Sequence, residues 1–490
     1  MKSRTLMCIT AITLFGALAI SVRLDAQERS ANQQHKSEHN RYKLVDVGTF
    51  GGPSGYVAQD LLSTGSSSGV LNNRGALVGA ADTSTPDPDY LPGSGFFPID
   101  PLIMHAFQWQ KGVLTDLGAL PGNNNSFATW ISANGLIAGF SENGVIDPQF
   151  GVPQVDAVLW KDGKIIDLGG YFSSAGAVNN RGQVVGNTLN TATLPALNVR
   201  AFLWENGKMQ DLGTLGGTFA GAGLVNERGQ VSGVSYTNST PNPVTGIPTQ
   251  DPYLWENGTM LDLGTLGGTF GVPNALNNRG QVVGQSNLAG DANFHPFLWE
   301  GSALRDLGTL GGDFGTAYSI SESGDVVGWS TTPGDSAVHA FLWSGGTITD
   351  LGVLEGEVCS VAYAVNTKRQ VVGYSDDDCN HGNAHAFLWE NGVMIDLNSF
   401  VPPDSGVQLT FALSISERGE IATLGLLPNG DQHVFAVMPT GQKAGLSAST
   451  TKVGHPGNAV SRPTPSDLIT RIRVQMGKRY RTPARGGAWK

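Results

Sequence analysis

Two residue types recur in this sequence at spacings that could build a chemical site. An aspartate begins the tripeptide Asp-Leu-Gly, or a near variant, eight times, and a histidine precedes Ala-Phe or a variant five times. A ring of carboxylates and imidazoles could hold metal ions. A turn aspartate that accepts hydrogen bonds from backbone amides explains the recurrence equally well. We therefore predict that the aspartates form turns and that the histidines form hydrogen bonds at strand edges. The aspartates are Asp46, Asp116, Asp167, Asp211, Asp262, Asp306, Asp350 and Asp396, and the histidines are His105, His295, His339, His385 and His433.

One acidic segment resembles a calcium-binding loop. Asp376, Asp378 and Asn380 place oxygen ligands at alternate positions, but the following Gly382 comes one residue late and no glutamate stands at the twelfth position. These three residues are a weak calcium candidate, with a solvated acidic loop as the alternative. The sequence contains no zinc-type spacing, phosphate loop or dinucleotide fingerprint. We therefore assign no metal, no cofactor and no catalytic residue.

Two cysteines remain beyond the N-terminal segment that holds Cys8. Cys359 and Cys379 flank a turn at residues 366–370, and their midpoint, position 369, falls inside it. They are expected to face each other across an antiparallel hairpin. In an oxidising compartment this arrangement predicts a disulfide bond.

An internal repeat supplies the elements that position these residues. Ala-Phe-Leu-Trp and its variants end at seven tryptophans, and an eighth copy around Phe435 lacks the tryptophan. Turns such as Asn-Asn-Arg-Gly at 277–280 and Asn-Gly at 257–258 separate short apolar runs, and both are hairpin signals. Four strands per ~44 residues, repeated eight times, predict an all-β propeller of four-stranded blades, with the tryptophans packed between them. The tryptophans are Trp109, Trp160, Trp204, Trp255, Trp299, Trp343 and Trp389.

The ends of the repeat region predict how the propeller closes. In the fifth complete blade the strands are read as 272–276, 281–285, 296–300 and 304–307. The run 42–47 matches the last strand of a blade, whereas 411–415, 421–424 and 433–438 supply the first three. An N-terminal strand that completes the C-terminal blade leaves no open sheet edge. We expect eight blades, or seven if the divergent first unit does not form a full one.

Three motifs that recur in fixed order resemble a known family. The segment 262–270, the Asn-Asn-Arg-Gly-Gln-Val-Val-Gly run at 277–284 and His339-Ala-Phe-Leu-Trp343 are similar to the HAF repeat of bacterial extracellular repeat proteins. The resemblance covers about 400 residues and implies export and a repeat architecture, without a biochemical activity. The chain departs from the pattern at Asp156, Arg200 and Asp251, which replace the histidine.

The two ends of the chain differ from the repeat region in composition. Residues 1–26 have early basic residues and an apolar run, as in a secretory signal peptide, and cleavage after either Ala19 or Ala26 fits a small-residue rule. A linker at 27–40, the propeller at 41–440 and a basic, disordered tail at 441–490 would follow. The formal charge is −11 overall, +2 for residues 1–26 and +9 for 441–490, so residues 27–440 carry −11 − 2 − 9 = −22.

That charge and the composition restrict the function. A body so acidic repels phosphate backbones, which argues against nucleic-acid binding. No second apolar run approaches a membrane span, so we expect a monomeric protein that is secreted or periplasmic after signal removal. We predict a non-enzymatic binding scaffold whose partner is an extracellular glycan or an envelope protein. The alternative is a propeller enzyme of the glycosidase or lyase type that acts on an extracellular polymer.

The connections between second and third strands are the predicted binding face. They are long in the first four units, at 81–104, 142–155, 188–199 and 236–250, and shrink to 287–294 and 331–338 in the next two. Long loops on one rim are suited to recognition, and aromatic side chains among prolines would be partly pre-ordered there. The candidate ligand-binding residues are Tyr90, Phe96, Phe97, Phe150 and Tyr236.

Overall fold

The fold was analysed in a computed structural model of the chain. The structure describes residues 38–58, 69–90, 100–122, 124–189, 198–379 and 382–445. It contains two compact units, of which the larger includes all residues from Tyr42 to Pro439. The helices in the described ranges are single 3-10 turns, and none of them has the length or apolar character of a membrane-spanning helix. The predicted signal peptide, most of the linker and the tail beyond residue 445 lie outside the described residues.

The larger unit is built from antiparallel β-hairpins. The strands of its first half are β1 (Glu38–Asp46), β2 (Gly51–Tyr56), β3 (Ala76–Pro86), β4 (Leu102–Gln110), β5 (Val113–Asp116), β6 (Ser126–Ile131), β7 (Ile137–Ile146), β8 (Pro153–Lys161), β9 (Lys164–Gly169), β10 (Ser174–Val178), β11 (Val184–Leu189), β12 (Val199–Glu205), β13 (Lys208–Asp211), β14 (Ala220–Val225), β15 (Val231–Tyr236), β16 (Gln250–Glu256) and β17 (Thr259–Asp262). The second half contains β18 (Gly267–Leu276), β19 (Val282–Leu288), β20 (Phe294–Glu300), β21 (Ala303–Asp306), β22 (Gly315–Ile320), β23 (Val326–Thr331), η1 (Pro333–Asp335), β24 (Val338–Ser344), β25 (Thr347–Asp350), β26 (Cys359–Val365), β27 (Val371–Asp376), β28 (His385–Glu390), β29 (Val393–Asp396), η2 (Leu397–Phe400), η3 (Pro403–Ser405), β30 (Gln408–Ile415), β31 (Ile421–Leu426) and β32 (Gln432–Gly445).

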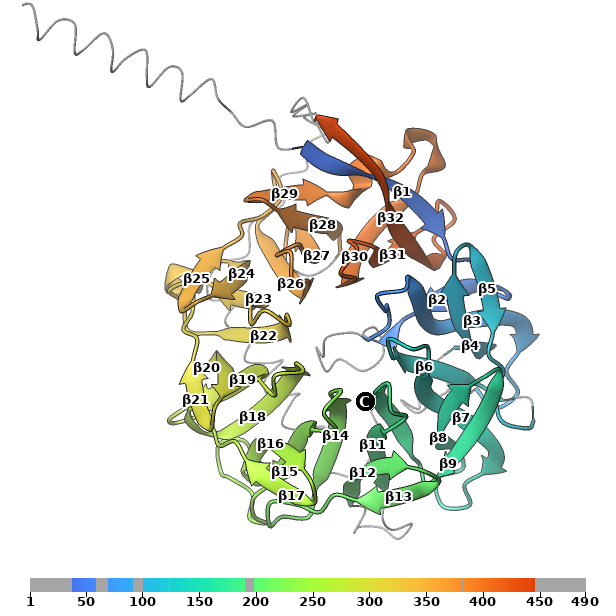
Figure 1. Cartoon of the computed structure of the whole chain (residues 1–490), viewed down its shortest axis with the longest axis vertical. Coiled ribbons are helices and arrows are strands. Elements are labelled where there is room, and N and C mark those ends of the chain that lie inside the picture. Colours follow the sequence, from blue (N-terminus) through green and yellow to red (C-terminus); the bar gives the residue numbers. More distant parts are fainter. Residues whose placement is uncertain are drawn as a thin grey trace, which may run out of the picture. The chain divides into compact units, whose positions relative to one another are not determined.

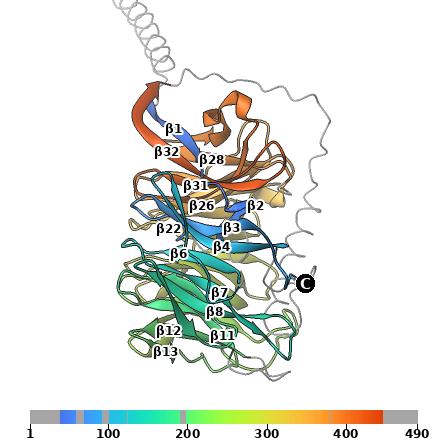
Figure 2. The same cartoon turned by 90° about the vertical axis from the view of Figure 1, so that its right-hand side faces the viewer.

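These strands form four-stranded sheets that fit propeller blades, as the repeat predicts. Six sheets have four strands each, and a seventh joins the sets β14–β17 and β18–β21 through one parallel pair, Gln250 with Phe270. The divergent first unit also forms a four-stranded sheet, in the order β2-β3-β4-β5. The sheets follow one another in sequence order in Figure 1. The strand order β1-β32-β31-β30 confirms that the N-terminal strand completes the last sheet, and β1 lies beside β32 in Figures 1 and 2.

A glycine in the second strand allows close backbone packing in the hairpins of the first seven sets of strands, whereas Thr423 stands at this position in the last one. In the β14–β15 hairpin a β-bulge between Ala222 and Leu224 shifts the first strand by one residue. The shift brings the carbonyl oxygen of Gly221 over Gly233, where an added Cβ would lie 1.9 Å from it. Gly284 and Gly328 occupy equivalent positions with the same 1.9 Å approach. The glycine of the Val-Val-Gly run is therefore required by close backbone contact.

The hydrophobic core lies between neighbouring sheets rather than in one central cluster. One cluster joins Val283 and Leu298 of one sheet to Phe341 and Trp343 of the next. The predicted role of the tryptophans as core residues is confirmed for Trp109, Trp160, Trp255, Trp299 and Trp343, which are all at most 9% exposed. Each sheet therefore depends on its neighbour for burial of its apolar face.

The Asn-Asn-Arg-Gly turns also join neighbouring sheets. Asn277 Oδ1 accepts hydrogen bonds from the backbone amides of Arg279 and Gln281, which close its own turn. Its Nδ2 donates to the carbonyl of Ser321 in the next sheet at 3.1 Å. The same side-chain bridge starts from Asn72, Asn179, Asn226 and Asn366.

Candidate binding site

The recurrent aspartate has the predicted turn role in all eight copies. Its Oδ1 accepts a hydrogen bond from the backbone amide two residues later, as in Asp306 with Gly308 at 2.8 Å and Asp396 with Asn398 at 2.8 Å. The six other copies form the same bond to a glycine amide at 2.7–2.8 Å. A short Asx-type turn therefore explains why the aspartate recurs.

The same carboxylate also faces the residue at the histidine position of the repeat. Nδ1 of His295 lies 2.8 Å from Asp306 Oδ2, and His105, His339 and His433 form equivalent pairs with their aspartates. His385 instead pairs with the buried Glu357 at 2.5 Å. The predicted hydrogen-bonding role of the histidine is confirmed, and each imidazole nitrogen named here has a carboxylate partner.

The three copies that lack histidine have different electrostatics at this position. Burial and the facing carboxylate of Asp262 raise the pKa of Asp251 to about 7. Burial also raises the pKa of Asp156; a hydrogen bond from Asn143 counteracts part of this effect, and the Asp167 carboxylate adds to it. A buried carboxyl group that faces a second carboxylate tends to retain its proton.

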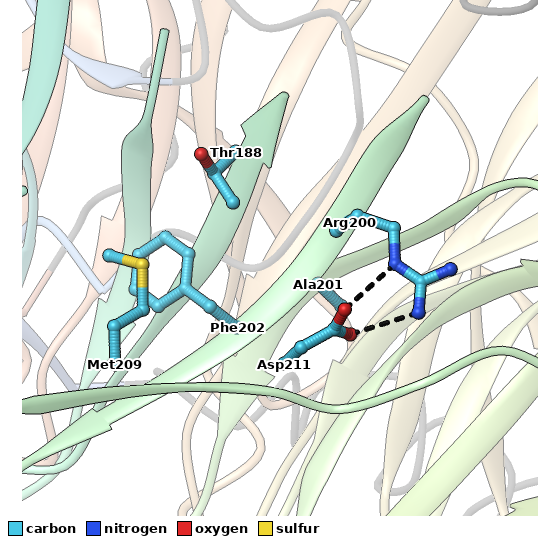
Figure 3. Close-up of a pocket in the computed structure, with 6 residues that line it drawn as sticks. All are labelled: Thr188, Arg200, Ala201, Phe202, Met209 and Asp211. Atoms are coloured by element: carbon cyan, nitrogen blue, oxygen red, sulfur yellow. Dashed lines mark hydrogen bonds and ion pairs between the residues drawn. The ribbon is translucent and has the colours of Figure 1, made fainter. Parts of the chain in front are cut away.

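Arginine at the third of these positions lies beside a pocket. Arg200 donates from Nε and Nη2 to the two carboxylate oxygens of Asp211, at 3.0 and 3.1 Å (Figure 3). A pocket of about 230 Å³ opens next to this pair, on the sheet β10–β13. Its lining residues are Thr188, Arg200, Ala201, Phe202, Met209 and Asp211. Because Thr188 pairs with Arg200 across β11 and β12, and Phe202 with Asp211 across β12 and β13, strand register brings these side chains together.

A cluster of partly exposed aromatic rings lies on the loops before this sheet. Phe150 packs edge-to-face on Phe172 with 5.6 Å between ring centroids, and Tyr171 does the same with Phe172 at 5.0 Å. The Tyr171 hydroxyl donates to Asp147 Oδ2 at 2.8 Å. Phe172 has φ of 44°, a conformation that bulky residues rarely adopt. The predicted candidate Phe150 is therefore part of a fixed aromatic group, which we call the aromatic cluster: Phe150, Tyr171 and Phe172.

The other predicted aromatic residues have different environments. Tyr236 is only 2% exposed and packs on Phe219, which places it in a core cluster and corrects its prediction as a loop-surface residue. It ends strand β15, so its side chain turns inward with the sheet alternation. Tyr90 is partly buried, at the last described position before residues 91–99. Phe96 and Phe97 lie outside the described residues.

The second of the long connections is also different from the prediction. Residues 142–155 are mainly an extension of the β7–β8 hairpin, because Glu142 pairs with Val155 and Ile146 with Pro153. Asp147 closes the remaining turn by accepting from the backbone amides of Gln149 and Phe150. The hairpin projects Phe150 at its tip.

The predicted disulfide between Cys359 and Cys379 is present, with 5.4 Å between the two Cα atoms. Its position in the hairpin is different from the expectation. Cys359 pairs across the ladder with Asp376, and Cys379 follows in the loop after β27. The bulge between Ala362 and Ala364 is one reason why the midpoint of the sequence does not locate the facing residues.

The weak calcium candidate has no supporting geometry in the described residues. Asp376 is fully buried, and its Oδ1 accepts from the backbone amide of Cys379 at 2.5 Å. Among the described residues, Asp378 does not belong to a group of potential metal ligands that lie close together. Asn380 lies outside the described residues. The one close group in the described ranges contains both cysteines of the disulfide, whose sulfurs bond to each other.

Two further carboxyl groups with raised pKa lie near the first long connection. Burial and the carboxylate of Asp100 raise the pKa of Asp82 to about 7. Burial raises that of Glu142 to about 7, although hydrogen bonds from Asn125 oppose this effect. The two side chains are 0% and 1% exposed. They are buried polar groups without access to solvent in this conformation.

Comparisons with known proteins give fold-level likeness only. No protein-family model matches the chain, and no curated protein does either. Among solved structures, the β-propeller domain of the trilobed protease from Pyrococcus furiosus is 9% identical with a TM-score of 0.40; the alignment covers 65% of this chain and 97% of that one. Dipeptidyl peptidase 4 from Porphyromonas gingivalis is 10% identical with a TM-score of 0.40, covering 79% of this chain and 62% of the peptidase. The acylaminoacyl peptidase of Pyrococcus horikoshii is 10% identical with a TM-score of 0.37. That alignment covers 64% of this chain and 50% of the peptidase.

At such identities and scores these neighbours transfer no activity, and the match spans only about half of the acylaminoacyl peptidase. The assignment of propeller-like blades rests on the four-stranded sheets themselves. The resemblance to the HAF repeat stays a prediction.

Sequence reasoning noted Arg200 only as a departure from the repeat and did not identify Tyr171 or Phe172. In both places the sequence departs from the repeat: Arg200 replaces the histidine, and Tyr171 and Phe172 lie in an altered crossover. Where the next three copies read Asp-Leu-Gly-Thr-Leu-Gly-Gly, this crossover reads Asp-Leu-Gly-Gly-Tyr-Phe at 167–172. Residues that depart from the repeat are not needed for the fold that all copies share, so they are the positions at which to look for a binding site.

Proposed function

We propose that this chain is an exported, eight-bladed, closed β-propeller of the HAF-repeat type that acts as a non-enzymatic binding scaffold. The observation that carries this proposal is the unequal length of the connections between second and third strands. They span 87–101, 190–198 and 237–249 in the first, third and fourth sheets, but only 147–152 in the second and 289–293 and 332–337 in the next two sets of strands. Loops on a rigid repeated scaffold are the usual carriers of recognition.

Contacts between the first and last sheets support closure. The amide of Glu417 donates to Asn73 Oδ1 at 2.8 Å, and Nε2 of Gln432 in β32 donates to the carbonyl of Gly55 in β2 at 3.4 Å. Leu424 and Val434 share a buried cluster with Leu77 of the first sheet. These contacts repeat the bridges that join consecutive sheets elsewhere.

The disulfide between Cys359 and Cys379 supports export, because such bonds persist in oxidising compartments. A signal peptide at residues 1–26 is consistent with the same destination.

The enzyme alternative would require an accessible acid with a perturbed pKa. Asp82 and Glu142 have raised pKa values of about 7, but their side chains are at most 1% exposed. A polymer cannot reach them without rearrangement. This burial favours the scaffold over hydrolysis by these two residues.

The proposal is tested by exchange of the loops. The mature chain is screened on a glycan array and in a pull-down with envelope proteins, and a variant receives the 289–293 connection in place of 87–101 and 237–249. We expect loss of binding with a nearly unchanged melting temperature. Replacement of the Asn257-Gly258 hairpin turn by the equivalent Asp162-Gly163 turn is the matched control and should leave binding intact. Retained affinity in the loop variant would contradict the proposal.

A further inference from the structure

The pocket on the sheet β10–β13 exists at the one repeat where arginine replaces histidine. In the repeats with histidine, as at His295, the imidazole reaches the aspartate directly. At Arg200 the longer guanidinium forms two parallel bonds to Asp211, and the pocket of about 230 Å³ lies beside them (Figure 3). The arginine side chain is 21% exposed and the aspartate 53% exposed, so both polar groups are accessible from the pocket mouth.

The polar wall of this pocket has no net charge. The bidentate pair neutralises both partners, and an anion would compete with Asp211, just as a cation would compete with Arg200. The bonds to Asp211 use Nε and Nη2, so the Nη1 hydrogens still point away from the pair. Carboxylate oxygens have further lone pairs, although Asp211 Oδ1 also accepts from Gly213. This wall therefore offers donors and acceptors together, which suits uncharged hydroxyl groups.

Three of the four other lining residues are apolar. Ala201, Phe202 and Met209 form the floor, and Phe202 is 1% exposed. The volume lies below the ~300–1,000 Å³ of pockets for drug-sized ligands. A small ring with one C–H face and hydroxyl groups on its edge fits both the floor and the wall.

The aromatic cluster adjoins the pocket through Thr188. The Thr188 hydroxyl accepts from the Tyr171 amide and donates to the Tyr171 carbonyl, both at 3.1 Å, while its side chain also lines the pocket. This anchors the crossover that carries Tyr171 and Phe172. The edge-to-face contacts of Phe172 with Phe150 and Tyr171 hold its ring in place despite the positive φ. A fixed aromatic surface beside the pocket could stack against a second ring of the same ligand.

We propose that the pocket and the aromatic cluster together bind an uncharged glycan, with one sugar residue in the pocket and the next on the aromatic cluster. The proposal rests on the binding-scaffold function above and names its ligand class. Arg200 and Asp211 bind hydroxyl groups, and the apolar floor and the aromatic rings contact sugar C–H faces.

The test uses the mature chain and calorimetric titration with soluble uncharged oligosaccharides of gluco, manno and galacto configuration, in parallel with uronic-acid oligosaccharides. Two variants remove the two halves of the site. Arg200→His restores the residue of the other repeats and keeps a partner for Asp211, and Phe172→Gly removes the ring at a position whose φ glycine adopts readily. Arg305→His, which changes an exposed arginine of another sheet, is the control.

We expect at least one uncharged oligosaccharide to bind, with affinity at least tenfold weaker in each site variant and unchanged in the control. Unchanged affinity in Arg200→His and Phe172→Gly, with melting temperatures equal to the parent, would overturn this site while leaving the scaffold function intact. Binding of uronic-acid oligosaccharides alone, or of an envelope protein alone, would overturn the ligand class. Absence of any glycan binding by the parent chain would also overturn this inference, whereas the scaffold function would fail only if the protein pull-down were negative as well.

Discussion

Replacement of Asp251 by asparagine should stabilise the protein by an amount that grows as the pH rises above about 4. Asp251 is 8% exposed, and burial together with the facing Asp262 raises its pKa from 3.8 to about 7 in the folded state. A folded-state pKa above the unfolded value means that the native protein binds the extra proton. The stability of the parent chain therefore falls as the pH rises from about 4 through about 7.

The size of the effect follows from that shift. Each pKa unit corresponds to 1.36 kcal/mol, so a change from 3.8 to about 7 corresponds to at most ~4 kcal/mol above pH 7. The substituted asparagine side chain would carry no charge and could still donate a hydrogen bond to Asp262. We expect no difference between Asp251→Asn and the parent at pH 4, and a gain that grows through pH 7 and is complete at pH 8.

The assay is urea denaturation of the two proteins across this pH range, with midpoints compared at each pH. Asp404→Asn, at an exposed position in η3, is the control and should show no pH-dependent difference. A stability difference that is the same at pH 4 and pH 8 would refute the reasoning, because it would show that Asp251 does not change its protonation between the two states.

Three further changes test the fold. Thiol titration of the purified, unreduced protein should find no free thiol at Cys359 or Cys379, and reduction should destabilise the fold by about 3 kcal/mol through loss of a loop constraint; two free thiols would contradict the bond. Gly233→Ala should destabilise the fold by ~3 kcal/mol or more, because its Cβ would lie 1.9 Å from a carbonyl oxygen. In the control Gly223→Ala, on the partner strand, the added Cβ meets nothing within 4 Å, so thermal stability should change little. Equal effects of the two substitutions would disprove the close-contact argument. The pKa of His433 is raised by its aspartate partner, so its contribution is present below about pH 6.5 and is lost as the pH rises through the higher folded-state pKa. His433→Gln should therefore cost about 0.5–1 kcal/mol at pH 5.5 and less at pH 8.5, and a cost independent of pH would reject that role.

The strand that completes the last sheet, the sheet composition and the turn aspartate were predictable from sequence because each follows from local chemistry. Four turn-separated apolar runs per repeat specify four hairpin-linked strands, and the fifth set of strands was placed within a few residues of β18–β21. The recurrence of Asp-Leu-Gly predicted an Asx-type turn, which the structure has in every copy, as at Asp306. The run at 42–47 had the sequence of a fourth strand and found its partner in β32.

Residue environments that depend on register or on a neighbouring sheet were less predictable. Tyr236 was expected on a loop but ends a strand with its side chain in the core, and the connection at 142–155 became a paired hairpin extension. A bulge between Ala362 and Ala364 shifted the register by one residue, and Cys359 pairs with Asp376 while Cys379 lies beyond the strand. Period-2 alternation turns a register change of one residue into a change of face, so small local shifts decide burial.

The repeat by itself therefore determined the four-stranded sheets, their turns and the strand that links the two ends. Only the tertiary structure decided which side chains meet between sheets and loops: the bridge from Asn277 to Ser321, the pairing of Asp251 with Asp262, and the pocket at Arg200 beside Tyr171. The physical reason is that turn and strand preferences act over a few residues, whereas these contacts join residues that are far apart in the sequence or that meet only through strand register.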